Sequence, residues 1–407
     1  MNLGLVIGAA GLLMAAIALP VTWANLRRGR GEQTSIGFRQ ASEYVRAHQP
    51  RLYELAVTSL PESWRADGIP MITRPNWILS SPKAAESVQL IWQEKPPEGD
   101  RLEGSRRRAR GIMPRHNDGS PYATYSHALV ELGGMTQLYN GWTYRPVAID
   151  AVADHLQLTF TSGRYFDHLD TTEVLAYEAA KRDHARRHLP LAGPYRRYLE
   201  NPFDLSRRST SLGTCTLTLR VGNSTCGFYM HQRNSGGLIV GPDILHVVPA
   251  GEFTPADIGL ESRQSDFDIW RTVMREFAEE FLDIEEAYGR GGRPLDYEHD
   301  APFSKLVAGR RLGSVRLSVL GLGLDPLTWK PELLMACAID DEVFDDIFAD
   351  LVANGREGTI LVGPNGHGIP FTAENVGRYS EIPHTRCSAR SCLILAWRHR
   401  VELRLGG

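Results

Sequence analysis

The order of apolar and polar positions predicts a membrane helix followed by a mixture of helices and strands. From Leu3 to Ala24 no residue is charged, which gives about 22 positions where a membrane-spanning helix needs about 20. Apolar residues then recur at intervals of three and four over residues 35–60, as in a helix. In the second half, short apolar or alternating segments separated by turns predict strands, and residues 267–286 have the wide apolar stripe of a long helix.

The charges beside the apolar run predict its orientation. Arg27, Arg28 and Arg30 follow the run, whereas a secretory signal peptide carries its positive charge before it. Because positive charge is retained on the cytoplasmic side, we expect a single-pass plasma membrane protein with everything after residue 26 in the cytoplasm. Glycines at small-residue spacing (Gly4, Gly8 and Gly11) leave homodimerisation through this anchor open.

Composition divides the chain into an anchor (1–26), a linker (27–34), a mixed N-terminal region (35–205) and a C-terminal domain (206–407). Residues 94–121 are rich in Pro, Gly, Asp and Arg, which predicts a mobile loop. Its arginines either contact phosphates or lipid headgroups near the membrane or form an ordinary solvated charge run; they are Arg106, Arg107, Arg108 and Arg110.

The remaining elements are expected from local periodicity. We predict strands at 87–93, 156–160, 214–221, 226–232, 245–248, 314–320 and 333–339, and further helices at 172–187, 343–354 and 372–379. The strands at 214–221 and 226–232 should form a hairpin around Gly222-Asn223-Ser224.

Overall charge and cysteine content exclude several classes of protein. The 407 residues are 42% hydrophobic and carry a net charge of −3, so the chain is globular and has no global attraction to nucleic acid. No helix-turn-helix or zinc pattern suggests specific nucleic-acid binding either. The five cysteines are scattered without a CxxC pair, which argues against a disulfide framework or a zinc site and fits a reducing compartment.

The most informative chemistry lies in the long helix. Glu276, Glu279 and Glu280 are spaced to project from one face, where three like charges repel one another. A divalent cation would relieve this repulsion, and Mg²⁺, which prefers oxygen ligands, would bring a diphosphate with it. Arg275 could orient one of the carboxylates. The alternative is an ordinary surface helix whose acidic face is solvated.

This segment resembles the signature of the Nudix superfamily, in which a glycine and a spaced glutamate precede Arg-Glu-apolar-x-Glu-Glu-x-Gly. The matching residues are Arg275 to Phe277, Glu279 and Glu280, and Val247 to Gly251 resembles the preceding strand, with Gly251 in the glycine role. The resemblance implies an α+β fold, a Nudix-like α/β/α sandwich with a mixed sheet. It also implies that the three glutamates bind metal and that one of them acts as a base, with Arg275 and Gly251 contributing to the site.

Two departures from the signature change the expected geometry. Gly251 lies further from Arg275 than in the family, so residues 253–268 should hold an insertion in which Asp266 or Asp268 replaces the intermediate glutamate. Leu282 stands where a glycine usually ends the helix, which predicts that the helix continues toward Glu286.

Residues 202–400 also resemble the Nudix-like domain of a family of actinobacterial regulatory proteins. The similar elements include His246 to Phe253, Trp270 to Phe281 and Leu320 to Leu327. The leading hypothesis is therefore a membrane-anchored domain that binds a nucleotide or nucleoside diphosphate derivative as a sensor or regulator, with weak or no hydrolysis. The alternatives are a working Mg²⁺-dependent hydrolase of such a compound and a scaffold for a protein partner.

Overall fold

The computed structural model describes the chain from residue 38 to residue 405. Within that range it leaves out 39–40, 42, 46, 67, 117, 134–137, 153–154, 185–190, 234–243, 286–293, 357 and 364. The anchor and linker expected at 1–34 lie outside the described residues. In the part that is described, no helix is both long enough and apolar enough to cross a bilayer.

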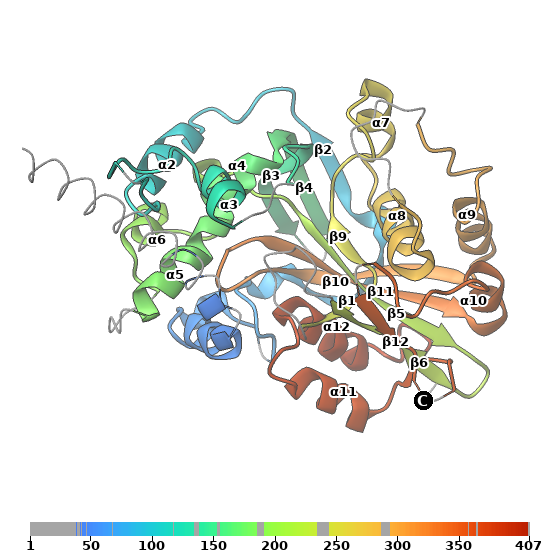
Figure 1. Ribbon diagram of the computed structural model, residues 1–407. Coiled ribbons are helices and arrows are strands. Elements are labelled where there is room, and N and C mark those ends of the chain that lie inside the picture. Colours follow the sequence, from blue (N-terminus) through green and yellow to red (C-terminus); the bar gives the residue numbers. More distant parts are fainter. Residues whose placement is uncertain are drawn as a thin grey trace, which may run out of the picture.

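The central element is a mixed β-sheet, as expected for an α+β protein (Figure 1). Its strand β5 runs parallel to β11, and the other neighbours are antiparallel. In spatial order the strands are β1 (Ile78–Ala84), β10 (Val315–Leu324), β11 (Pro331–Asp340), β5 (Gly213–Val221), β6 (Cys226–Phe228) and β13 (Ile369–Pro370), with β9 (Ala250–Glu252) also paired to β5.

Helices cover both faces of this sheet. Along β11, Leu333, Met335 and Cys337 belong to one hydrophobic cluster with α8 (Ile269–Leu282), whereas Leu334 and Ala336 belong to another with α12 (Cys387–Arg398). Helices α9 (Phe303–Leu312) and α10 (Asp341–Ile347) lie on the same side as α8. Helix α11 (Ala373–Glu381) lies on the same side as α12. Burial on both faces explains why β10 and β11 are almost continuously apolar.

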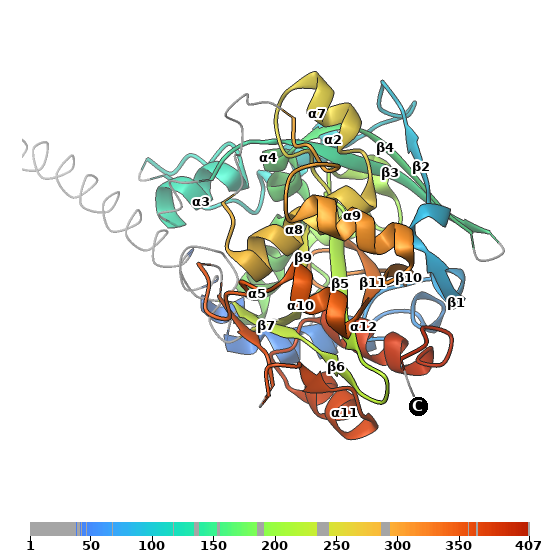
Figure 2. The same ribbon diagram turned by 90° about the vertical axis from the view of Figure 1, so that its right-hand side faces the viewer.

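Two smaller sheets flank the central one. One contains β2 (Gln89–Trp92), β4 (His155–Arg164) and β3 (Trp142–Val152), and the other contains β12 (Gly358–Leu361), β7 (Met230–Arg233) and β8 (Leu245–Val247). The hairpin predicted at 214–221 and 226–232 is present only in its first part: β5 pairs with β6 up to Phe228, and the rest of the predicted second strand is β7 of the other small sheet. Figure 2 shows the side of the molecule that carries α7 (Leu260–Ser265), α8 and α9. Helix α7 lies next to the strand ends of the β2–β4–β3 sheet.

A group of helices from the N-terminal half gathers at one end of the molecule (Figure 1). They are α2 (Leu102–Ala109), α3 (Tyr125–Gly133), α4 (Tyr165–His168), a π-helical turn (Leu169–Glu173), α5 (Val174–His184) and α6 (Pro194–Leu199). Helix α5 corresponds to the helix expected at 172–187.

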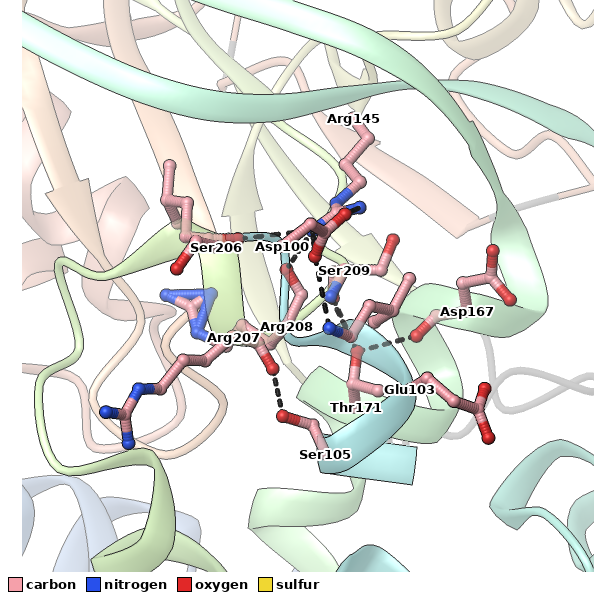
Figure 3. A network of polar contacts seen from close by, with 12 residues as sticks. Asp100, Glu103, Ser105, Arg145, Asp167, Thr171, Ser206, Arg207, Arg208 and Ser209 are labelled. Atoms are coloured by element: carbon pink, nitrogen blue, oxygen red, sulfur yellow. Dashed lines mark hydrogen bonds and ion pairs between the residues drawn. The ribbon is translucent and has the colours of Figure 1, made fainter. Parts of the chain in front are cut away.

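The prediction of a loop throughout residues 94–121 was wrong, since α2 lies within it. The helix is held by partners that are distant in sequence: Arg106 pairs with Asp167, and the Ser105 hydroxyl donates a hydrogen bond to the Arg207 carbonyl (Figure 3). Just before the helix, Asp100 accepts two hydrogen bonds from the buried Arg145 side chain, at 2.7 and 3.1 Å. A composition typical of solvated loops therefore belongs here to a folded segment.

The N-terminal and C-terminal halves share hydrogen bonds and core. Strand β1 pairs with β10, with Ile78 opposite Gly321. From the helical residues 47–58, the Tyr53 hydroxyl donates a 2.7 Å hydrogen bond to Asp325 and accepts one from Arg386 at 3.0 Å. Burial raises the pKa of Tyr53 well above its usual range. The first described helix is thus fixed to the C-terminal half by a buried polar contact.

Candidate functional site

Helix α8 forms where the apolar stripe predicted it, but its ends are determined by polar contacts. Asp268 caps the N-terminus by accepting a 3.0 Å hydrogen bond from the Arg271 backbone N–H. The expected extension to Glu286 was wrong, because the helix ends at Leu282 and Asp283 adopts a left-handed conformation with φ of 54°. The Arg356 backbone N–H, at 3.0 Å, and side chain hold Asp283 there and lower its pKa.

The structure brings Gly251 and the acidic helix together. In β9, Gly251 is opposite Thr214 of β5, and its Cα faces the Glu276 carboxylate. A Cβ added at Gly251 would lie only 1.8 Å from the Glu276 Oε1. A side chain on the strand would occupy the space of the carboxylate, so Glu276 can lie against the strand in this position only beside a glycine.

Glu280 is used by the fold itself. Its side chain has no exposed surface, and its Oε2 accepts a 3.0 Å hydrogen bond from the Ala250 backbone N–H. The Nδ1 of the buried His231, on β7, lies 3.4 Å from the Glu280 Oε1, although it is not aligned for a hydrogen bond. This carboxylate therefore joins α8 to β9 and β7.

The other two glutamates of the helix lie closer to the surface. Glu276 and Glu279 are both partly buried, in contrast to Glu280. In the residues that the structure describes, no three Asp, Glu, His or Cys side chains come together as metal ligands would.

Arg275 is buried and contacts residues 253–268, which precede the helix, as well as Tyr297. It donates a 3.1 Å hydrogen bond to the Tyr297 hydroxyl and another to the Thr254 carbonyl, and it lies 3.4 Å from the Asp266 carboxylate. Asp266 also accepts hydrogen bonds from the Tyr297 hydroxyl and the Ala256 backbone N–H, both at 2.8 Å. Asp266, which was expected to replace the intermediate glutamate, thus fixes residues 253–268 against α8.

A second group of buried charges lies next to the same strand and was not predicted. The Lys330 Nζ is 2.5 Å from a Glu252 carboxylate oxygen and 3.5 Å from one of Glu332. Burial opposes the charge of Lys330, but the two glutamates outweigh it and raise its pKa. The Cys215 thiol donates a 3.2 Å hydrogen bond to Glu332, and burial raises the pKa of Glu332. No local motif in the sequence marks these residues, because they come from three different strands and a turn.

Comparison with known protein families and with curated proteins does not identify the chain. No model of a known protein family matches the chain, and no curated protein matches it.

Proposed function

We propose that this chain is a membrane-anchored protein whose C-terminal half, residues 206–407, is a Nudix-like domain that binds a nucleotide or nucleoside diphosphate derivative. In this proposal residues 3–24 form a single membrane span and the domain lies in the cytoplasm. The domain acts as a sensor or regulator with weak or no hydrolysis.

The observation that carries the choice of binding over hydrolysis is the burial of Glu280. A hydrolase of the kind that the sequence resembles would use all three glutamates for metal and base. Here Glu280 is committed to the Ala250 backbone N–H and to the neighbourhood of His231. If Glu280 is not available to the metal, a hydrolase loses one of its three carboxylates. The rate of hydrolysis should then fall more than the affinity for the ligand.

The remaining acidic residues suit a ligand that brings its own phosphates. Glu276 and Glu279 are partly buried on one face of α8, and Gly251 lies against the first of them. Mg²⁺ in proteins is commonly held by one or two carboxylates together with phosphate oxygens of the bound compound. Two glutamates beside a glycine strand are consistent with this mode of binding.

The test is a thermal-shift measurement on the full chain with Mg²⁺ and a panel of nucleoside diphosphate derivatives, run together with assays for released phosphate and nucleoside monophosphate. A ligand at 100 times its Kd should stabilise the folded protein by about 2.7 kcal/mol. We expect one member of the panel to raise the unfolding temperature of the wild type without turnover. The double variant Glu276→Gln, Glu279→Gln should lose this effect, whereas the exposed-site control Glu54→Gln should keep it.

Other outcomes would assign a different function. Turnover that the double variant loses would establish the hydrolase. If no panel member produces either a shift or turnover, the nucleotide proposal is wrong and the acidic helix is better explained as a surface for a protein partner.

A further inference from the structure

Helix α2 presents a concentrated positive charge to solvent. Four arginines in or beside the helix are exposed, and within the described residues none of them has a carboxylate at ion-pair distance; they are Arg101, Arg107, Arg108 and Arg110. Arg106 differs, since it pairs with Asp167 and Glu103. We refer to Arg107, Arg108 and Arg110, at the C-terminal end of the helix, as the α2 arginine surface.

The helix is fixed in one orientation, so the α2 arginine surface is permanently displayed. Ser105 and Ala109 are buried on its inner side, and the Ser105 hydroxyl is bonded to the Arg207 carbonyl. Figure 3 shows the inner contacts of this helix, with Ser105 directed toward Arg207. The Arg108 guanidinium lies 5.8 Å from the centre of the Tyr198 ring of α6. An exposed arginine cluster on a rigid support can meet a flat anionic surface without first becoming ordered.

The described chain begins at the end of the molecule to which α2 belongs. Phe38 packs against Tyr125 of α3 and Tyr177 of α5, with ring centroids 5.9 and 5.4 Å apart. Helices α2, α3 and α5 all contact the same π-helical turn and gather at one end of the molecule (Figure 1). Between Ala24, where the predicted span ends, and Phe38 the chain can extend at most about 50 Å. The span would hold this end of the molecule near the membrane.

More positive charge lies around the same point of entry. The Lys181 ammonium is 5.6 Å from the centre of the Tyr177 ring, which itself contacts Phe38. Lys181 is exposed, and partial desolvation and then the charge of Arg115 lower its pKa. An anionic surface placed against this end would favour the charged form of Lys181.

We propose that the α2 arginine surface docks on the anionic headgroups of the membrane that holds the chain. The inference rests on the membrane span proposed above and is independent of nucleotide binding. Basic side chains within a Debye length of an anionic leaflet are attracted to it, and the attraction disappears with salt. The end of the molecule that carries α2 would lie flat on the membrane, with the α8–β9 site on another part of the surface.

The test uses hydrogen–deuterium exchange of the full chain in lipid nanodiscs. The discs contain phosphatidylcholine alone or with about 30% phosphatidylserine, an anionic lipid of the cytoplasmic leaflet. We expect backbone amides of Leu102–Ala109 to exchange several-fold more slowly in the anionic discs. The difference should vanish in about 0.5 M salt, and also in the triple variant Arg107→Gln, Arg108→Gln, Arg110→Gln.

A control variant separates local docking from loss of charge in general. Arg311→Gln, Arg378→Gln, Arg404→Gln removes the same number of exposed arginines from other elements and should keep the slow exchange. Equal exchange of α2 in both kinds of disc would refute docking. A chain that stays in solution would refute the span on which the inference rests. If a short RNA slows the exchange of the α2 backbone amides in neutral discs, the surface binds nucleic acid instead. The thermal shift with nucleotides tests the site at α8 separately. Failure of the docking proposal can therefore be distinguished from failure of the nucleotide proposal.

Discussion

Replacing Glu280 by alanine should destabilise the protein. A side chain that serves only to bind a ligand or metal usually lowers the stability of the folded protein. Replacing such a side chain leaves the stability unchanged or raises it. Glu280 is different because its carboxylate accepts the Ala250 backbone N–H at 3.0 Å and has no exposed surface. Alanine at this position removes that buried hydrogen bond to a charged group.

The size of the effect follows from these two features. Loss of a buried hydrogen bond to a charged group costs about 1–3 kcal/mol, and loss of a buried methylene adds about 1 kcal/mol. We therefore expect a loss of about 2–4 kcal/mol. For 407 residues the entropy of unfolding is near 0.85 kcal/mol/K, so the unfolding temperature should fall by about 2–5 °C.

The assay is thermal unfolding followed by tryptophan fluorescence at one fixed scan rate, with wild type and variants side by side. Glu280→Gln keeps an oxygen that can accept the Ala250 N–H and should lose no more than about half as much. The exposed-site control Glu54→Ala should stay within about 0.5 kcal/mol of wild type. An unchanged or raised unfolding temperature for Glu280→Ala would show that the carboxylate is not structural and would restore it to the ligand set.

Two further predictions concern other contacts. Gly251→Ala should cost no more than about 1 kcal/mol, because the new Cβ would lie 1.8 Å from the Glu276 Oε1 and the partly buried carboxylate has to turn away. Gly377→Ala, which meets no atom within 4 Å, should be neutral or stabilise by up to about 1 kcal/mol. An unfolding temperature of Gly251→Ala above that of Gly377→Ala would contradict this. The hydrogen bond from Arg51 lowers the pKa of Asp183, so its stabilisation is present above about pH 4 and is lost as the pH falls through the lowered folded value. Asp183→Asn should therefore be less stable than wild type at pH 7 and approach it below about pH 4, and a gap in unfolding temperature that does not change with pH would disprove the assignment.

Periodicity predicted the body of α8 but not its ends. The apolar stripe from Trp270 to Phe281 is a local signal, and it is buried as the spacing requires. The end at Leu282 depends on Arg356, which lies 73 residues further along the chain and holds Asp283 in its left-handed conformation. A local pattern contains no information about such a partner.

The same reasoning applies to the candidate site. Glu276 and Gly251 were both selected from the sequence, and the structure places them in contact. The spacing of the three glutamates could not show that Glu280 points to the Ala250 backbone, since helical geometry gives the same face to all of them. The buried group around Lys330 was missed because charged residues in separate strands form no pattern.

Strand β3 shows how a local rule can mislead. Pro146 within residues 142–152 argues against a strand, since proline cannot donate a ladder hydrogen bond. The structure accommodates it at the edge of the small sheet, where the register shifts between Pro146 and Ala148. Whether a segment lies at an edge is a property of the whole fold.

The pairing of β1 with β10 has a consequence for how the protein is made. During synthesis β1 leaves the ribosome long before β10 exists, so residues 78–84 have to wait for most of the chain before they find their partner. If the C-terminal half were expressed alone, β10 would present a row of unpaired backbone groups, and such an edge recruits strands from other molecules. Residues 78–84 thus protect the edge of β10 from aggregation, and a shortened version of the protein should keep them.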